Sequence, residues 1–244
     1  QSTQDGRIVA VIGGHNYKSG DLNKATVKQQ PGSSIKPILD YGMAYKYLDW
    51  CTGHTVKDEP IEAGIKNWDN QFHGSMTISE ALENSWNIPA YTTFQEVKKV
   101  AGSKNLTEDL ESLGIDMSDQ DPDLPDSYAI GGWSTGVSPV EMAGAYATVA
   151  NNGKYIESHT VNYIEVAKDN ETIKVDEQLQ KKATNSIGED VSFMIRETML
   201  SYTSNGSGSY AYLNGIDNIG AKTGTSNWDS KSSYVKAGKA VIYG

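Results

Sequence analysis

The sequence predicts an α+β fold, because strand-like apolar segments lie near both of its ends and helix-forming segments fill its middle. Residues 7–12 read Arg-Ile-Val-Ala-Val-Ile before two glycines, which is typical of a strand that ends in a turn. Further strands are predicted at 219–223 and 240–243. We expect strands from both chain ends to pair in one mainly antiparallel sheet that is flanked by helices, with a mainly helical subdomain at roughly 50–150.

Helices are predicted at 37–50, 78–84, 89–100, 140–150 and 190–200. The second follows the capping box Thr77-Ile78-Ser79-Glu80, in which two side chains satisfy two free backbone N–H groups. Pro89 suits the first turn of the third helix, and Asp190 is predicted as the N-cap of the last. The acidic segment 116–126 is interpreted as a solvated loop, because it lacks the glycine and terminal glutamate of a calcium-binding loop.

Composition argues against several classes of protein. The formal net charge is −10, and affinity for nucleic acid depends on clustered Lys and Arg, so no nucleic-acid partner is expected. A single cysteine, Cys51, excludes an internal disulfide. The four histidines do not pair at metal-ligand spacing, so no metal site is predicted. No apolar run approaches the roughly 20 residues of a membrane helix, and no signal sequence opens the chain. We therefore expect a segment of a larger protein.

Ser33 and Lys36 form the first of three short motifs whose residue types suit catalysis. A serine hydroxyl is a poor nucleophile at neutral pH and needs a base close by. If a helix begins at Ser33, residues three apart share a face, so Lys36 is expected beside the Ser33 hydroxyl. The partial positive charge of the helix N-terminus helps to keep the lysine unprotonated. The alternative is an ordinary helix cap with a surface lysine.

The second motif is Ser85-Trp86-Asn87, between two predicted helices, where a loop can project Ser85 and Asn87 into one cleft. Its alternative is a helix-end loop whose side chains bond the backbone. Trp86 is a candidate to line the cleft or to pack between helices, Trp228 to flank the cleft, and Trp133 to support the core or a loop.

The third motif, Lys222-Thr223-Gly224 followed by Thr225, is predicted as an edge strand, with an ordinary turn as the alternative. It offers a cation, a hydroxyl and a glycine that lets a substrate backbone approach. Each motif alone is weak, because the sequence repeats the three spacings at Ser233-Tyr234-Val235-Lys236, Ser103-Lys104-Asn105 and Lys18-Ser19-Gly20. Only Ser33, Ser85 and Lys222 combine the expected order with the expected local structure.

The three motifs in this order resemble the signature of penicillin-binding proteins and class A β-lactamases. Segments 30–37, 85–90, 131–153 and 221–226 extend the similarity in collinear order, and the whole chain resembles the transpeptidase domain of class A, bifunctional penicillin-binding proteins. The resemblance implies a penicillin-binding and serine β-lactamase-like fold with an all-helical subdomain. It implies one transpeptidase domain over residues 1–244, without the glycosyltransferase domain and membrane anchor that such proteins carry upstream. It also implies further strands after the third motif, so the carboxyl-terminal part of the sheet is expected to be incomplete.

The resemblance further implies a D,D-transpeptidase. Ser33 would attack the D-alanyl-D-alanine end of a peptidoglycan stem peptide, and the acyl group would pass to an amine of a neighbouring stem. β-Lactams would leave a stable acyl-Ser33, and no cofactor is needed. The implied catalytic residues are Ser33, Lys36 as the base, Ser85 as a proton relay, Asn87 to orient the substrate, and Lys222. The implied substrate-binding residues are Trp86, Thr223, Gly224 and Thr225, with the backbone N–H groups of Ser33 and Thr225 as an oxyanion hole. The parent protein would lie at the extracytoplasmic face of a bacterial membrane, and this segment would be soluble.

Three other functions compete with this interpretation. A D,D-carboxypeptidase would use the same residues with water as the acceptor. A class A β-lactamase uses a Glu that activates water, and no Glu-x-x-Leu-Asn element lies between Ser85 and Lys222, which argues against it. A non-catalytic penicillin-binding sensor would also be acylated, so the motifs do not exclude it.

Overall fold

The computed structural model describes residues 1–14, 16, 18–161, 164–166, 171–173, 182–227 and 242–243. Its helices are α1 (Met43–Tyr47), α2 (Ile78–Glu83), α3 (Asn87–Ser112), α4 (Pro139–Ala150) and α6 (Glu189–Ser204), and its short 3-10 or π segments are η1 (Gly32–Ile35), η2 (Pro37–Gly42), η3 (Asp126–Ile130) and η4 (Ser209–Ala211). Antiparallel strand pairs are β1 (Thr55–Asp58) with β2 (Gly74–Thr77), β3 (Lys154–Tyr155) with β6 (Thr184–Asn185), β4 (Ile164–Val166) with β5 (Glu171–Ile173), and β7 (Ser226–Asn227) with β8 (Ile242–Tyr243).

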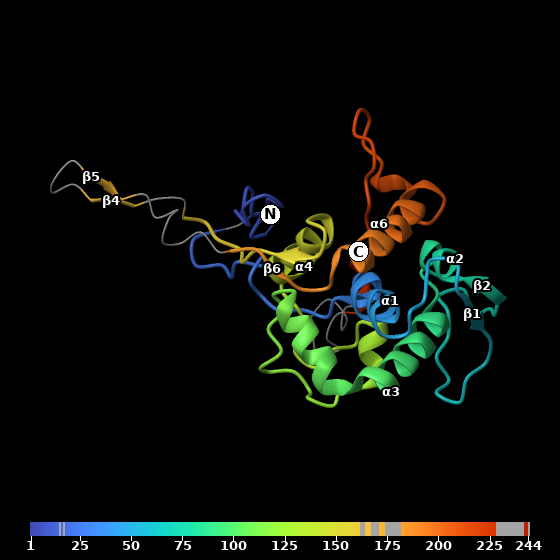
Figure 1. The fold of residues 1–244 in the computed structure, drawn as a ribbon. Coiled ribbons are helices and arrows are strands. Elements are labelled where there is room, and N and C mark those ends of the chain that lie inside the picture. Colours follow the sequence, from blue (N-terminus) through green and yellow to red (C-terminus); the bar gives the residue numbers. More distant parts are fainter. Residues whose placement is uncertain are drawn as a thin grey trace.

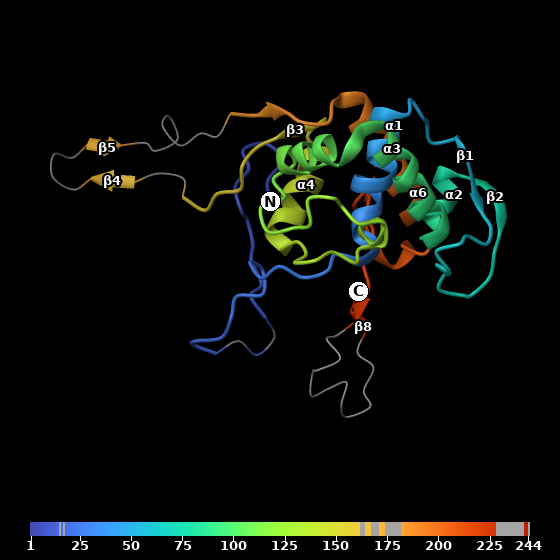
Figure 2. The ribbon, with the colours of Figure 1, turned by 90° about the horizontal axis from the view of Figure 1, so that it is seen from below.

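The continuous segment η1–η2–α1 is the centre of the molecule. Residues 35–45 are buried at every position, Lys36 and Asp40 included, so the segment is a core helix and not a surface helix with one apolar face. In Figures 1 and 2 this segment, in blue, lies among α3, α4 and α6, and it contacts both α3 and α6. Its middle, η2, is a π-helix, a form that is common at functional sites. The residues that follow the first motif are therefore held from all sides.

The predicted helices are confirmed, with differences at several of their ends. The Thr77–Glu80 capping box is present, and α3 begins at Asn87 rather than at Pro89. This helix continues to Ser112 across a kink at Gly102, whose φ is +75°, so the glycine bends the helix where a helix end was predicted. Asp190 lies in the first turn of α6, and Gly188 is the N-cap.

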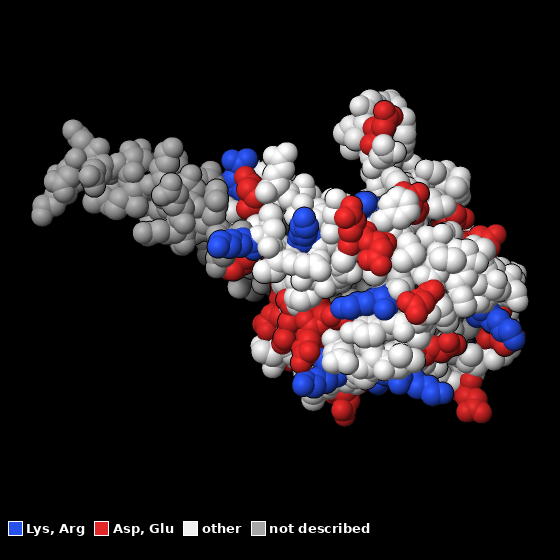
Figure 3. Space-filling model, in the orientation of Figure 1, with Lys and Arg blue, Asp and Glu red and all other residues white. Residues whose placement is uncertain are grey.

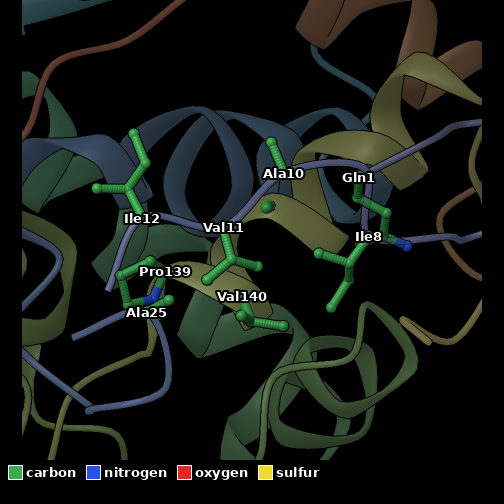
Figure 4. A pocket seen from close by; sticks show the side chains of 9 residues that line it. Gln1, Ile8, Ala10, Val11, Ile12, Ala25, Pro139 and Val140 are labelled. Atoms are coloured by element: carbon green, nitrogen blue, oxygen red, sulfur yellow. The ribbon is translucent and has the colours of Figure 1, made fainter. Parts of the chain in front are cut away.

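The predicted sheet from both chain ends is not formed by the described residues. Segment 7–12 makes one bridge, Arg7 to His159, and the N–H of Ile8 donates to the His159 carbonyl at 2.8 Å. A strand forms only where a neighbouring backbone pairs with it through hydrogen bonds. Here the segment packs along α4 instead. Figure 4 shows Ile8 and Val11 lining an apolar pocket of about 150 Å³ together with Val140 of α4.

Of the other two predicted strands, one is absent and one is formed in part. Segment 219–223 belongs to no strand, because it packs on α6, where the carbonyl of Ile219 accepts a hydrogen bond from the Thr203 hydroxyl. Of segment 240–243, residues 240–241 lie outside the described residues, and Ile242–Tyr243 is β8, paired with β7.

The region 50–150 is mainly helical, but it is not all-helical, because it contains the β1–β2 hairpin. A single cluster of buried apolar side chains runs from Ile35 through α3 and α4 to Met199 of α6. The helical region therefore shares its core with the segment that carries the first motif.

Figure 3 shows acidic and basic side chains spread over the face it presents, whereas Lys36, Asp40 and Asp58 are buried. Segment 116–126 is largely a loop, as predicted, and Lys28 donates to Asp116 at 3.0 Å and to Asp119 at 2.7 Å. None of the helices in the described ranges is both long and apolar enough to cross a bilayer.

Candidate active site

The first and third motifs meet through their backbones, although they lie near opposite ends of the sequence. Gly32 has a φ of +55°, and a Cβ placed on it would lie 2.4 Å from the carbonyl oxygen of Thr225. A Cβ placed on Gly224 would lie 2.3 Å from the carbonyl oxygen of Pro31. Side chains do not tolerate such distances, so only glycine permits this approach. The peptide that carries Ser33 is thereby held next to the peptide that carries Thr225.

Lys36 connects the first motif to the second. Its side chain is 0% exposed, and its Nζ donates to the carbonyl oxygens of Ser85 at 2.7 Å and Trp86 at 3.1 Å, and to Oδ1 of Asn87 at 2.8 Å. These bonds use all three N–H donors of a protonated lysine. Lys36 was expected beside the Ser33 hydroxyl, but within the described residues no hydrogen bond joins the two. A protonated amine has no lone pair that could accept the serine proton.

The loop between α2 and α3 presents Ser85 and Trp86, as predicted, whereas Asn87 belongs to α3. Ser85 has a φ of +56°, which is uncommon for a residue with a Cβ. The turn is held because the N–H of Ser85 donates to Leu82 at 2.9 Å and the N–H of Trp86 donates to Ala81 at 3.0 Å. In this conformation the Ser85 hydroxyl accepts a 2.8 Å hydrogen bond from Nζ of Lys222. All three motifs are therefore joined through Ser85 and its neighbours.

Asn87 is the first residue of α3, and both polar atoms of its side chain are occupied. Its Oδ1 accepts from Lys36, and its Nδ2 donates to the carbonyl of Lys66 at 2.9 Å. Its backbone N–H donates to Oδ1 of Asn67 at 2.9 Å. The amide is thus oriented by the protein itself, with its carbonyl toward the buried amine.

The third motif is extended but belongs to no strand, because β7 begins two residues after Gly224. Lys222 also donates to the carbonyl of Thr223 at 3.1 Å, and its Nζ lies 4.6 Å from the ring centroid of Tyr202. The hydroxyls of Tyr202 and Thr223 are 2.7 Å apart. Tyr202 lies on α6 and was not predicted as a site residue, since no sequence motif marks it. It supports two of the residues that were predicted.

Burial strongly lowers the pKa values of the two lysines, Lys36 and Lys222. It lowers the pKa of Lys36 to about 7, although the nearby carboxyl of Asp40 acts in the opposite direction. Burial and the charge of Lys36 lower the pKa of Lys222 to about 6. Burial also raises the pKa of Asp40 well above its usual range. Because like charges disfavour each other at short range, protonation of one lysine opposes protonation of the other. The site therefore offers an amine that is ready to accept a proton near neutral pH.

Among the described residues, the predicted tryptophans and the repeated motifs take no part in the hydrogen bonds that join the three motifs, except for Trp86. Trp86 is 6% exposed and stacks on His73, with ring centroids 3.9 Å apart, which matches the packing alternative rather than a cleft wall. Trp133 is 1% exposed and stacks on Tyr128 in the core. Trp228 and the second serine–lysine pair at 233–236 lie outside the described residues. The Ser103 hydroxyl donates to the carbonyl of Asp123 at 2.9 Å, away from the three motifs. In the part of the chain that the structure describes, no cluster of three or more His, Cys, Asp or Glu could hold a metal.

Comparison with known proteins places this geometry in a family. The family model of the penicillin binding protein transpeptidase domain matches residues 1–241. Penicillin-binding protein 1A/1B of Bacillus subtilis is 35% identical over 234 residues, which are 93% of this chain and 24% of that protein. Penicillin-binding protein 4 of the same organism is 33% identical over 229 residues, covering 92% of this chain and 35% of that protein. This chain thus spans about a third or less of the length of these relatives.

Solved structures show the same fold. The crystal structure of penicillin-binding protein 1A from Haemophilus influenzae superimposes with a TM-score of 0.73 at 24% identity, over 92% of this chain and 38% of that chain. The penicillin-binding protein PonA1 from Mycobacterium tuberculosis gives the same TM-score at 23% identity, over 90% of this chain and 58% of that chain. The chain therefore belongs to the penicillin-binding protein transpeptidase domain family.

Proposed function

We propose that this chain is the transpeptidase domain of a class A penicillin-binding protein, and that it cross-links peptidoglycan stem peptides through an acyl-enzyme on Ser33. One observation carries the proposal: two lysines from different motifs, Lys36 fully buried and Lys222 partly buried, both with lowered pKa, are connected through Ser85. This arrangement suits acyl transfer, which needs a base for the nucleophile and a proton donor for the leaving amine. Residues 1–244 form this domain, with the mainly helical region at roughly 50–150 as its subdomain.

Lys36 is the base in this proposal. Loss of one proton leaves its amine with two N–H donors and one lone pair, so one of its three hydrogen bonds must be released. The lone pair then accepts the proton of the Ser33 hydroxyl as the serine oxygen attacks the carbonyl carbon of the penultimate D-alanine. The bond from that carbon to nitrogen breaks, and the nitrogen takes up one proton, so terminal D-alanine leaves as a neutral amine.

Ser85 supplies the proton to the leaving nitrogen. Because Lys222 donates to the Ser85 oxygen, the Ser85 O–H is directed elsewhere, toward a substrate in the cleft. Lys222 then replaces the proton that Ser85 gives up. In the second half-reaction an amine of a neighbouring stem attacks the acyl-Ser33 carbonyl and gives one proton, through Ser85, back to Lys222. The bond from the carbonyl carbon to the serine oxygen breaks, and Lys36 returns its proton to that oxygen.

Lys222 and Thr223 hold the terminal carboxylate of the donor peptide. A carboxylate that arrives beside Lys222 favours the charged form of the amine, and so raises the pKa that burial has lowered. The backbone N–H groups of Ser33 and Thr225 form the oxyanion hole, and a donor of this kind contributes about 2.7–4 kcal/mol in other acyl-transfer enzymes. Gly224 lets the substrate backbone approach, and Asn87 orients both Lys36 and the substrate amide.

The proposal extends to the longer protein from which such a domain comes. A glycosyltransferase domain and a membrane anchor precede it there, and the transpeptidase works at the extracytoplasmic face of a bacterial membrane on stem peptides. β-Lactams occupy the donor site and remain as an ester on Ser33.

Intact-protein mass spectrometry after incubation with benzylpenicillin tests the nucleophile. We expect one long-lived adduct on the peptide that contains Ser33, no adduct on Ser33→Ala, and a normal adduct on Ser103→Ala, the matched control from the repeated serine–asparagine spacing. An adduct on folded Ser33→Ala protein would refute the assignment. With a D-alanyl-D-alanine peptide as the donor, transfer of the acyl group to an added D-amino acid supports transpeptidation, and transfer to water alone indicates a carboxypeptidase. Acylation by the drug without turnover of the peptide indicates a sensor.

A further inference from the structure

A buried carboxylate lies behind the second motif, on an element that no catalytic motif includes. Asp58 is the last residue of β1, and its side chain is 0% exposed. Burial of a charged group is costly unless hydrogen bonds compensate for the lost water. Here the carboxylate accepts from Nδ2 of Asn67 at 2.7 and 2.9 Å, from the backbone N–H of His73 at 3.0 Å, and from Nδ1 of His73 at 2.7 Å. The loop between β1 and β2 is thereby tied to one point.

Asn67 transmits this tie to α3. Its Nδ2 faces Asp58 and the carbonyl of Gln71, so its Oδ1 points the other way. That oxygen accepts the N–H of Asn87 at 2.9 Å and the N–H of Ile88 at 3.4 Å. The first N–H groups of a helix lack partners within the helix, and the N-cap residue of α3 supplies no side-chain bond. A residue twenty positions earlier therefore caps the helix that begins with Asn87.

His73 carries a second connection. Its Nδ1 bonds Asp58, and its Nε2 lies 3.1 Å from the carboxylate of Asp69. Its ring stacks on Trp86, at 3.9 Å between centroids and 16° between planes. The carbonyl of Trp86 is one of the three acceptors of Lys36. Both connections from Asp58 thus end at groups that hold the buried amine, Asn87 by one path and Trp86 by the other.

We propose that Asp58 is a positioning residue of the site, which acts through Asn67 and His73 to place the acceptors of Lys36. This inference rests on the proposed function of Lys36 as the base. Asp58 touches neither the substrate nor the reacting atoms. Its effect is to fix the Ser85–Asn87 loop, so that the amine stays within reach of the nucleophile.

The test replaces the carboxylate by an amide, in Asp58→Asn. An amide presents only one acceptor to the N–H groups of Asn67 and His73, and its own NH₂ group opposes them. We expect the acylation rate constant with a fluorescent penicillin to fall by on the order of tenfold to a hundredfold, as misplacement by about 1 Å does. The dissociation constant of the non-covalent complex should change by less than about twofold, because the carboxylate-binding residues lie on the third motif.

The pH dependence of acylation gives a readout that a purely structural role would not move. The Asn87 oxygen favours the charged form of Lys36, so its displacement lowers the pKa of the amine and moves the midpoint to lower pH. Asp40 and Lys222, the other titratable groups that face this amine, are unchanged in the variant. The matched control is Asp109→Asn, which also removes a largely buried carboxylate. Asp109 accepts hydrogen bonds from Lys46 and, at 2.7 Å, from the Tyr47 hydroxyl, and it makes no contact with the Ser85–Asn87 segment among these bonds.

Four outcomes decide the proposal. Slower acylation and a lower midpoint in Asp58→Asn, with Asp109→Asn unchanged, support it. Acylation within about twofold of the parent on folded Asp58→Asn overturns it. If Asp58→Asn does not fold, the second variant is His73→Phe, which keeps a ring against Trp86 and changes a side chain that is 29% exposed. Unchanged acylation in His73→Phe also overturns the proposal. If the parent protein is not acylated, the proposed function fails. An NMR titration of Lys36 in lysine-labelled protein then still tests the role of Asp58. An equal titration midpoint of Lys36 in the parent and in Asp58→Asn overturns the proposal.

Discussion

The approach of the first and third motifs predicts that Gly32→Ala disables the site. The φ of Gly32, +55°, lies in the left-handed region, where an alanine costs about 1–2 kcal/mol. The new Cβ would also lie 2.4 Å from the Thr225 carbonyl oxygen and 2.8 Å from the Thr225 nitrogen. An ordinary contact begins at 3.4 Å, so the two backbones must separate by about 1.0 Å (3.4 − 2.4).

Gly64→Ala separates the conformational cost from the collision. Gly64 has a φ of +67°, and nothing lies within 4 Å of the position of its Cβ. We expect this control to lower Tm by about 2–8 °C, from 1–2 kcal/mol at 2–4 °C per kcal/mol for a chain of this size, and to leave acylation unchanged. Gly32→Ala should lose more stability than the control, and its acylation should fall by about 10²- to 10³-fold, as when one oxyanion donor is lost.

The assay is stopped-flow acylation by a fluorescent penicillin, together with thermal unfolding of both variants. If Gly32→Ala is acylated as fast as the parent and unfolds at the same temperature as Gly64→Ala, then the motifs do not depend on this backbone contact. The assignment of the Ser33 and Thr225 N–H groups as a pair of donors would fail with it.

Three further perturbations test other parts of the structure. Acylation should rise with pH and reach half its maximum near the Lys36 pKa of about 7, because only the unprotonated amine accepts the serine proton; a flat rate from pH 5 to 9, measured with the same drug, would exclude Lys36 as the base. Tyr202→Phe removes the bond to the Thr223 hydroxyl and keeps the ring near Lys222, so we expect several-fold weaker binding of carboxylate-bearing ligands and no change for uncharged analogues in competition assays; equal losses would contradict a carboxylate pocket. Phe94→Ala, at 0% exposure in the core, should cost about 3–5 kcal/mol in urea unfolding, whereas Phe193→Ala, at 53% exposure, should stay within about 0.5 kcal/mol; similar losses at both positions would contradict the observed burial.

Local chemistry explains what could be predicted from the sequence about the fold. The Thr77–Glu80 capping box and the helix-forming run after Pro139 are short-range signals, and both produced helices at the expected places. The strand predicted at 7–12 was wrong because pairing is a property of two segments, and a run of apolar residues does not reveal where the second segment lies. The helix predicted at 89–100 was too short, because Gly102, whose φ is positive, marks a kink in α3 and not its end.

For the site, too, the short motifs could be predicted from the sequence, and the residues that support them could not. The order of the motifs was enough to select Ser33, Ser85 and Lys222, and hydrogen bonds connect the motifs that contain them. The supporting residues escaped prediction, because Tyr202 and Asn67 are ordinary members of a helix and a loop until the chain folds. Only the three-dimensional arrangement shows that one supports the third motif and the other caps α3 at Asn87.

The contact between Gly32 and Thr225 also sets when the site comes into being. The chain is made from its amino-terminal end, so Ser33 exists before Thr225, and the helical core needs only residues up to about 199 to form around the central segment η1–η2–α1. A chain in that state lacks Thr225, which the proposed oxyanion hole requires, so we expect no acylation of Ser33. Penicillin labelling would then report that the segment around Thr225 has packed against Gly32, a stricter criterion than helical content or cooperative thermal unfolding.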